Sequence, residues 1–217
     1  MQLPWLDPGA PFPPTTTALA DPNGLLAAGA DLSVDTLLRA YAAGIFPWYS
    51  TGEPVLWWSP APRAVLWPRH LRISRSLNKV LRQQRFEVRI NSCFADVIAA
   101  CAQAPRVGQR GTWITREMQA AYVRLHHAGH AHSVECFAEG RLVGGLYGVR
   151  IGAMFFGESM FSRQDNASKV ALVHLCRQPG IRLIDCQQAT THLVSLGAMP
   201  MSRARFERAL ALACRQP

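Results

Sequence analysis

The chain has 217 residues, of which 49% are hydrophobic, so it is long enough for one large domain or two smaller ones and too apolar to be disordered. Its 23 Lys and Arg exceed its 14 Asp and Glu, which gives a net charge of +9. Residues 1–38 lack the basic residues of a secretory signal, and no uncharged apolar run is long enough to cross a bilayer. We therefore expect a cytoplasmic chain without a membrane segment, whose six Cys are reduced thiols.

The charge is unevenly distributed. Residues 1–62 contain one base and five acids, a net of −4, whereas residues 63–217 contain 22 bases and nine acids, a net of +13. A strongly basic part of this kind predicts a polyanionic partner. The alternative is ordinary solubility charge, since 21 of the 23 bases are Arg and a compositional bias would inflate the excess.

The first part of the chain predicts a small domain. An extended Pro- and Thr-rich start is followed by a turn at 21–24, a helix over Val34–Ala43 capped by Ser33, and a short strand over Val55–Trp58. The breaker Ser59-Pro60-Ala61-Pro62 places a domain boundary after residue 62, so we predict domains over 1–62 and 63–217. Of the tryptophans here, most are expected in the core and at least one as a platform for a stacked base.

A basic segment follows the next predicted strand, Ala64–Trp67. Bases at i, i+3, i+7 and i+10 form one stripe on a helix, and like charges on neighbouring turns repel each other. A solvated face normally mixes signs, so the stripe favours phosphate-backbone contact. The stripe and its extensions are Arg69, Arg72, Arg75, Lys79, Arg82, Arg85 and Arg89.

The middle of the chain predicts a strand over Phe86–Ile90, a helix over Cys93–Cys101, a loop over 104–112, and a helix over Arg116–Ala128. His126 and His130 are four residues apart, as in some metal sites. Gly129 ends the helix between them, and no further ligand lies at motif spacing, so packing and capping are favoured and no metal is expected.

Three strands with short turns, 133–138, 141–149 and 153–161, predict an antiparallel meander. Three glycines in its middle strand predict a close approach to the backbone. Period-two alternation places Met154, Phe156, Glu158, Met160 and Ser162 on one face of the last strand. Such a face is either a core hairpin or a pocket for an apolar ligand that also carries a cationic or hydroxyl group.

The rest predicts a helix from Asn166 to about Cys176, a strand over Arg182–Gln187, and two further helices, the last one ending at Cys214. The order of elements is α+β and suits an acyltransferase that binds its donor at a splayed sheet. Coenzyme A enzymes of that type use a glycine-rich loop before a helix, whereas residues 162–169 contain no glycine. We therefore expect a donor other than coenzyme A and no cofactor.

With these elements in place, a family resemblance is evident, and its motifs cover most of the chain in order. The motifs are DPNGLLAAGADLS (21–33), YAAGIFPWYS (41–50), PVLWWSPAPRAVLWP (54–68), HLRISRSLNK (70–79), GTWIT (111–115), AYVRLHHAGHAHSVE (121–135), LVGGLYGVRIGAMFFGESMFSR (142–163), NASKVAL (166–172), LIDCQ (183–187) and HLVSLGA (192–198). They resemble those of the bacterial leucyl/phenylalanyl-tRNA–protein transferases.

The resemblance implies a small N-terminal domain beside an acetyltransferase-like (GNAT-like) C-terminal domain with a mixed, largely antiparallel sheet. It implies an enzyme that moves Leu or Phe, less often Met, from aminoacyl-tRNA to the α-amino group of proteins starting with Lys or Arg. That addition marks the acceptor for degradation by the N-end rule. A monomer that needs no membrane and no metal is expected.

The resemblance also implies roles for individual residues. Asp185 and Gln187 correspond to the catalytic pair, with Glu158 nearby. The pocket for the transferred side chain corresponds to Leu146, Met160, Ser162 and Ile184, where other members have Met at position 146. The residues that meet the terminal adenosine or the tRNA correspond to Trp48, Trp113, Arg75, Lys79, Arg82 and Arg85. The segment 175–180 and the C-terminus are shorter than the family pattern, which leaves local helix length and packing open.

The expected chemistry is aminolysis of an ester without a covalent enzyme intermediate. We hypothesise that the Gln187 amide oxygen accepts a hydrogen bond from the attacking amine, while Asp185 orients Gln187 and favours positive charge on the nitrogen. Glu158 would hold the aminoacyl ammonium or a ribose hydroxyl. The alternatives are an RNA-binding module without chemistry and a small-molecule N-acetyltransferase.

Overall fold

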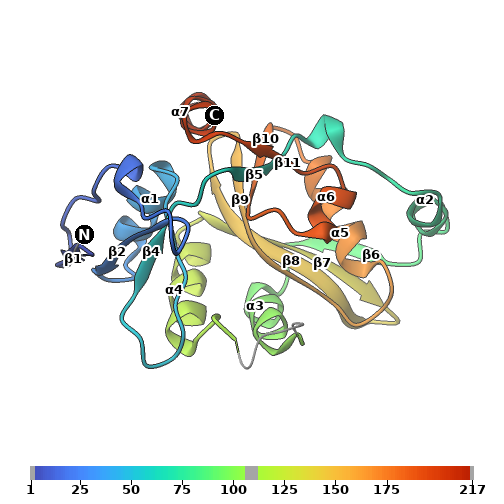
Figure 1. The fold of residues 1–217 in the computed structure, drawn as a ribbon. Helices are drawn as coiled ribbons and strands as arrows, with labels where there is room; N and C mark the ends of the chain where they lie inside the picture. The colour runs from blue at the N-terminus through green and yellow to red at the C-terminus, as the bar shows by residue number, and fades with distance from the viewer. Residues whose placement is uncertain (1–2, 106–111, 216–217) are drawn as a thin grey trace.

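The computed structural model describes residues 3–105 and 112–215, which form two β-sheets with helices between and around them (Figure 1). A four-stranded sheet, in the order β1-β2-β4-β3, lies at the N-terminal end of the molecule. Its strands are β1 Trp5–Leu6, β2 Leu25–Gly29, β3 Phe46–Pro47 and β4 Leu56–Trp58.

The larger sheet has seven strands in the order β11-β5-β10-β9-β8-β7-β6. Its pairs are antiparallel except β9 and β10, which run parallel. The α+β class, the mixed and largely antiparallel sheet, and the predicted meander are confirmed. The strands are β5 Arg63–Leu66, β6 Glu87–Ile90, β7 Ala131–Ala138, β8 Arg141–Ile151, β9 Met154–Ser162, β10 Leu183–Gln187 and β11 Met199–Met201.

Helices cover both faces of the larger sheet. In Figure 1, α3 and α4 lie below it, α5 and α6 lie on the opposite side, and α2 stands at the far end of the molecule. The helices are α1 Val34–Ala42, α2 Arg75–Arg82, α3 Phe94–Gln103, α4 Arg116–His127, α5 Ala167–Cys176, α6 Thr191–Ser195 and α7 Arg203–Cys214, with short 3₁₀ turns at Thr15–Thr17 and Pro68–His70.

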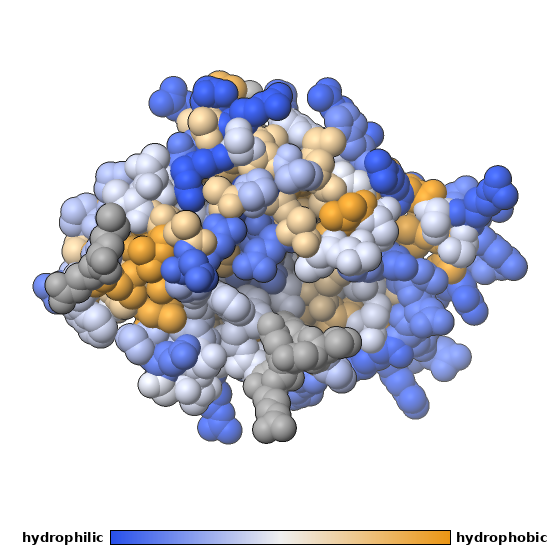
Figure 2. Space-filling model, viewed as in Figure 1, coloured by the Kyte–Doolittle hydropathy of each residue, from blue (hydrophilic) through white to orange (hydrophobic). Residues whose placement is uncertain are grey.

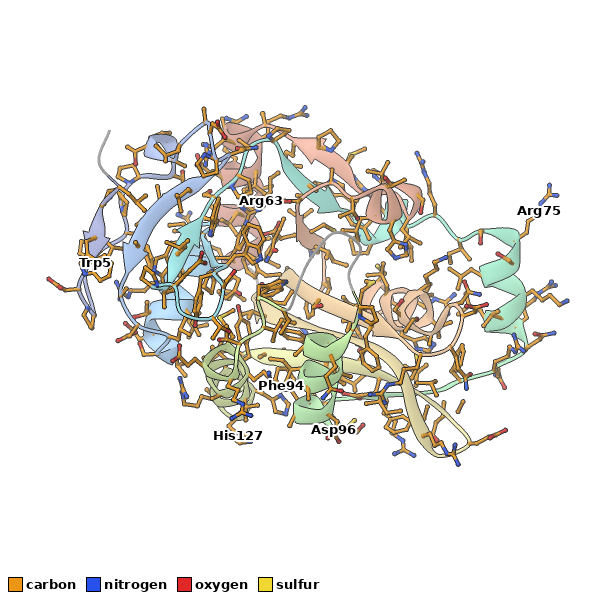
Figure 3. All side chains as sticks on the ribbon, turned by 60° about the horizontal axis from the view of Figure 1, so that its bottom comes forward. Trp5, Arg63, Arg75, Phe94, Asp96 and His127 are labelled. Atoms are coloured by element: carbon orange, nitrogen blue, oxygen red, sulfur yellow. The ribbon has the colours of Figure 1, made fainter. Side chains whose placement is uncertain are left out.

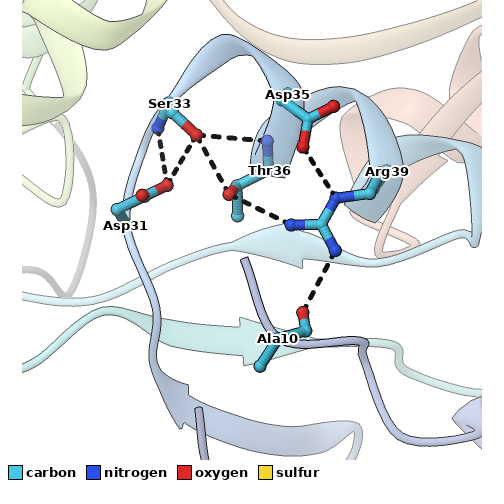
Figure 4. A network of polar contacts seen from close by, with 6 residues as sticks. All are labelled: Ala10, Asp31, Ser33, Asp35, Thr36 and Arg39. Atoms are coloured by element: carbon cyan, nitrogen blue, oxygen red, sulfur yellow. Dashed lines mark hydrogen bonds and ion pairs between the residues drawn. The ribbon is translucent and has the colours of Figure 1, made fainter. Parts of the chain in front are cut away.

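The start of α1 is fixed by the polar contacts shown in Figure 4. The predicted cap is confirmed, because Ser33 Oγ accepts a hydrogen bond from the Thr36 amide at 3.3 Å. Asp31 accepts bonds from the amide and hydroxyl of Ser33, and these bonds lower its pKa. Arg39 pairs with Asp35 at 3.0 Å and donates to the Ala10 carbonyl, so two of the N-terminal acids serve local structure.

The boundary after residue 62 falls between β4 and β5, which belong to different sheets. One hydrophobic core nevertheless runs across it, joining Tyr41 and Trp57 to Tyr122 and Phe156. A second core lies under α5, on the other face of the large sheet. We therefore keep the division into 1–62 and 63–217 as a proposal, since the two parts share buried side chains.

The sequence patterns failed at a few places. The short strands β1, β2, β3 and β11 were not predicted, because each lacks a long alternating pattern and depends on a partner strand. Asn166 occupies the N-cap of α5 in the left-handed region, with φ of 69°, but makes no side-chain cap. The hydroxyl of Ser162 instead accepts a hydrogen bond from the Ser168 amide at 2.9 Å.

The glycines of β8 have the close neighbours that the sequence predicted. A Cβ on Gly144 would lie 2.4 Å from the Cβ of Ala167, at the start of α5. A Cβ on Gly148 would lie 2.1 Å from the carbonyl oxygen of Phe156 on β9. The middle strand is therefore glycine-rich because α5 and β9 come too close for side chains.

We predict that Gly144→Ala lowers the free energy of unfolding by about 1–3 kcal/mol, because α5 has to move away from the sheet to admit the methyl group. Urea unfolding followed by far-ultraviolet circular dichroism measures the change. An unaltered midpoint would show that α5 does not pack closely on Gly144.

Candidate active site

The carboxylate of Glu158 is placed by a β-bulge. Tyr147 of β8 pairs with Ser159 and Gly148 pairs with Gly157, so Glu158 has no opposite residue and the alternation of β9 is interrupted. The prediction of one continuous face is therefore wrong beyond Glu158. Met154 and Phe156 lie in the core below the sheet, whereas Met160 packs on the opposite face with the α5 core.

Strands β9 and β10 separate just before Glu158. Their pairing ends at Phe156 and Asp185, and β9 continues to Ser162 without β10 beside it. A cavity of about 340 Å³ lies where the two strands part. Its apolar walls are Leu146, Phe155, Met160, Leu172, Leu175 and Ile184, and the polar groups Glu158, Asp185 and Gln187 also line it.

Three of the four residues predicted for a side-chain pocket are thus brought together: Leu146, Met160 and Ile184. Ser162 is not among the residues that line this cavity. It is exposed at the end of β9, where its hydroxyl holds the Ser168 amide. The reason is the length of β9, which carries Ser162 past the cavity to the N-terminus of α5.

Asp185 is held in a buried ion pair that the sequence analysis missed. Arg63 donates from Nε to Oδ1 at 2.8 Å and from Nη2 to Oδ2 at 2.7 Å, and both side chains are 1% exposed. The guanidinium lies between the rings of Phe46 and Phe206, each with its centroid 4.8 Å away. A bidentate pair in this setting fixes both side chains and offsets the charge of Asp185.

Gln187 is oriented by both neighbouring carboxylates. Its backbone N–H donates to Asp185 Oδ1 at 2.8 Å, and its side-chain Nε2 donates to Glu158 Oε1 at 2.9 Å. The backbone adopts φ of 60°, which a non-glycine residue seldom does, at an irregularity in the pairing of β10 with β5. The second contact turns the side-chain amide nitrogen of Gln187 toward Glu158, so the side-chain amide oxygen faces away from that carboxylate.

Two tyrosines complete the surroundings of Glu158. Tyr41 donates to Oε1 at 2.7 Å and Tyr122 to Oε2 at 3.1 Å, and the two hydroxyls also contact each other. Burial raises the pKa of Glu158 to about 7, although the tyrosine hydrogen bonds act in the opposite direction. Burial and the nearby Glu158 raise the pKa of both phenols well above their usual value, so they remain donors.

Two of the three tryptophans Trp48, Trp57 and Trp58 lie in the core, as the sequence suggested. Trp57 and Trp58 are buried, and their indole N–H groups donate to the carbonyls of Gly29 and Trp48. Trp48 is only partly buried, and it lines the 340 Å³ cavity together with Trp113. The same two rings line a neighbouring cavity of about 790 Å³. Gly111, the first residue of the GTWIT motif, lies outside the described residues.

Three of the four stripe residues, Arg75, Lys79 and Arg82, lie on α2, which stands at the end of the molecule (Figure 1), and Arg72 precedes this helix. Leu77 and Val80 pack inward, whereas Arg75, Lys79 and Arg82 are exposed, as is Arg85 just after the helix. Hydrophilic side chains cover this end in Figure 2, and Figure 3 shows Arg75 pointing away from the body of the protein. Among the described residues, no ion pair neutralises these four bases.

One of the histidines near the end of α4, His126, serves packing. The ring of His126 stacks on Phe94 with centroids 4.4 Å apart, and its Nδ1 hydrogen-bonds the Ala131 carbonyl at 2.8 Å.

None of the helices in residues 3–105 and 112–215 combines the length and apolar character that a bilayer-spanning helix requires.

Comparison with known proteins identifies relatives of the whole chain. Residues 65–211 match the family model described as leucyl/phenylalanyl-tRNA protein transferase, and residues 30–61 match the model of its N-terminal domain. A leucyl/phenylalanyl-tRNA–protein transferase of Aromatoleum aromaticum is 61% identical over 96% of this chain and 89% of its own. A leucyl/phenylalanyl-tRNA–protein transferase of Chromobacterium violaceum is 56% identical over 99% of this chain and 93% of its own length.

Solved structures resemble the chain only distantly. A GCN5-related N-acetyltransferase from Kribbella flavida covers 76% of this chain and 60% of its own, with 10% identity and a TM-score of 0.37. A structure titled L-PGS from Bacillus licheniformis covers 85% of this chain and 63% of its own, with 9% identity and a TM-score of 0.39. Scores this low carry no conclusion about activity.

We predict that Asp185→Asn lowers the free energy of unfolding by about 3–5 kcal/mol, because it leaves the Arg63 guanidinium buried without a counter-charge. The double variant Arg63→Met/Asp185→Leu removes both charges and should regain much of that loss. Urea unfolding of the two variants gives the comparison. A single variant as stable as the double would contradict the role of the pair.

Proposed function

Because the chain belongs to the leucyl/phenylalanyl-tRNA–protein transferase family, we propose that it moves Leu or Phe from aminoacyl-tRNA to proteins whose first residue is Lys or Arg. It is an aminoacyltransferase. On this proposal it acts in the cytoplasm as a monomer and creates an N-terminal degradation signal. Met is a less frequent donor residue.

The observation that carries the proposal is the apolar cavity beside Gln187. It lies at the small end of the range of about 300–1,000 Å³ for small-molecule sites, and its inner walls are aliphatic and aromatic. A Leu or Phe side chain inserted between Leu146, Met160 and Ile184 would leave its ester carbonyl near the polar groups. This mostly apolar lining favours an apolar side chain as the occupant.

The reaction requires little activation, because the donor is already an ester. The acceptor amine has an ordinary pKa of about 7.7–8.0, so a substantial fraction is neutral near neutral pH. The amide oxygen of Gln187 accepts a hydrogen bond from this amine and aligns it with the carbonyl carbon. Asp185 acts through the Gln187 backbone, and its ion pair with Arg63 supports a positioning role rather than stabilisation of positive charge.

Aminoacyl-tRNA would contact two separate regions. Trp48 and Trp113, at the rim of the cavity, offer aromatic faces for the terminal adenosine. Arg75, Lys79, Arg82 and Arg85 offer unpaired positive charge for phosphates at the far end. A cavity for the aminoacyl group and a distant basic helix together suit a ligand as long as a tRNA.

Both rival functions are less favoured. An RNA-binding module needs neither the apolar cavity nor a strained Gln187 between two carboxylates. For an acetyl-coenzyme A enzyme, amides before α5 would have to bind pyrophosphate. Here the amides of Arg163 and Gln164 bond the Val143 carbonyl, and that of Ser168 bonds Ser162 Oγ.

The activity is tested by incubating the protein with Leu-tRNA and a peptide that begins with Arg. We expect the peptide mass to increase by one leucine residue, and Gln187→Ala to slow transfer by about 10²-fold while the Kd for tRNA is kept. A peptide beginning with Glu is the acceptor control, and acetyl-coenzyme A replaces the tRNA in the donor control. Transfer from acetyl-coenzyme A alone would refute the proposal.

A second prediction concerns the basic helix. The double variant Arg75→Glu/Lys79→Glu should weaken tRNA binding. It should also reduce the slope of log Kd against log salt concentration by about 0.7–0.9 for each phosphate that the helix no longer neutralises. Arg205→Glu/Arg208→Glu on α7 changes the net charge equally at another place on the surface. Equal reductions in affinity in the two double variants would show that net charge, and not the α2 stripe, governs binding.

A further inference from the structure

A cluster of three buried side chains adjoins the proposed site. Tyr41 comes from α1, Tyr122 from α4 and Glu158 from the bulge of β9, and the tyrosines are at most 1% exposed. The carboxylate accepts from both phenols at 2.7 and 3.1 Å, and the two phenols contact each other. Each group therefore touches the other two, and the contacts close into a ring.

When Glu158 is ionised, the ring has three oxygen–oxygen contacts but only two protons to form hydrogen bonds with. Each phenol contributes one proton and the carboxylate none, so two protons serve three donor–acceptor contacts. A third proton on Glu158 completes the ring, because each group then donates once and accepts once. The cluster is therefore arranged to accept a single proton without losing a hydrogen bond.

We propose, building on the aminoacyl transfer argued above, that the Tyr41–Tyr122–Glu158 cluster carries the proton of the attacking amine to the departing ribose oxygen. Glu158 is the catalytic residue in this step, and the two tyrosines are positioning residues. This assigns Glu158 a role other than holding the aminoacyl ammonium or a ribose hydroxyl.

The carboxylate is within reach of the reacting groups. Glu158 lines the cavity, and its Oε1 also accepts from Gln187 Nε2 at 2.9 Å. The Gln187 amide thus lies between the amine, which its oxygen accepts on this proposal, and the carboxylate, which its nitrogen contacts, and both residues line the cavity. The buried phenols behind Glu158 exclude bulk water from the side away from the cavity.

The step is balanced. The neutral amine attacks the ester carbon, a C–N bond forms, and the nitrogen passes its surplus proton to the Glu158 carboxylate. The C–O bond to the ribose then breaks, and the oxygen that leaves takes the proton from Glu158. The products are an amide and a ribose hydroxyl, and the carboxylate returns to its starting state.

The electrostatic surroundings support this use. Burial brings the pKa of Glu158 to about 7, close to the pH at which a proton carrier works best. The groups that face it are Tyr41, Tyr122 and Gln187, which donate hydrogen bonds, Asp185, which raises its pKa, and Arg63, which lowers it. The phenols stay protonated, so the cluster gains and loses its proton at Glu158 alone.

Tyr41→Phe and Tyr122→Phe test the proposal, since each keeps the ring system and removes one donor to the charged carboxylate. The pKa of Glu158 should rise, so the ratio of variant to wild-type transfer rate should be about 0.1 at pH 6 and approach 1 above pH 9. The ratio cancels the titration of the acceptor amine. Tyr49→Phe is the matched control, because the Tyr49 hydroxyl contacts Thr115 and Glu117 instead.

Glu158→Gln provides the second variant. It should slow transfer by about 10²-fold or more at every pH and leave a profile that follows the acceptor amine alone. The proposal is overturned if the ratio of variant to wild-type transfer rate is the same at all pH values for the tyrosine variants. It is also overturned if Glu158→Gln transfers the amino acid at the wild-type rate. Urea unfolding and the Kd for tRNA establish that each variant is folded.

An infrared difference spectrum separates this proposal from the transfer activity on which it rests. Wild type minus Glu158→Gln should show one carboxyl group titrating near pH 7, and Tyr41→Phe should move it upward by about one pH unit. Absence of transfer by the wild type at any pH would refute the proposed function instead. A carboxyl group that titrates near pH 4.5 would refute the cluster even if transfer occurs.

Discussion

The buried ion pair between Arg63 and Asp185 is the contact on which the rest of the site depends. It ties β5 to β10 at the point where β10 leaves β9, and the space created there is the cavity. Because the pair is bidentate and 1% exposed, neither side chain can move without leaving a buried charge. Asp185 then fixes the backbone of Gln187, and through it the direction of the amide that faces Glu158.

The N-terminal part contributes side chains to the cavity and to the surroundings of Glu158 as well as to the fold. Its helix α1 supplies Tyr41 to the carboxylate on β9, and its Trp48 forms part of the rim of the cavity. Phe46, from the same part, packs against the guanidinium of Arg63. A chain lacking residues 1–62 would lose one donor of the proposed proton-carrying cluster and one wall of the cavity. The shared hydrophobic core is the physical reason that the two parts act together.

On the proposed function, binding and chemistry occupy different regions. The exposed bases Arg75, Lys79 and Arg82 lie on α2, at the end of the molecule away from the N-terminal sheet, whereas Asp185 and Glu158 beside the cavity are paired or hydrogen-bonded. A polyanion held at α2 contributes affinity that is screened by salt, and the buried site is little affected by that screening. This separation fits the proposed donor, a long nucleic acid with a small reactive group at one end.

The sequence by itself determined the α+β class, the meander, the helices and the family, because alternation, caps, turns and motifs are local properties of the chain. It also pointed to Asp185, Gln187 and Glu158, through a family resemblance rather than through spacing. Only the tertiary structure decided what surrounds them. Arg63, Tyr41 and Tyr122 lie 122, 117 and 36 positions from their carboxylates, and no local pattern links them. The bulge at Glu158 likewise depends on the register of β8, and it alone separates the carboxylate from Met160 and Ser162, since one inserted residue exchanges the faces of every residue that follows.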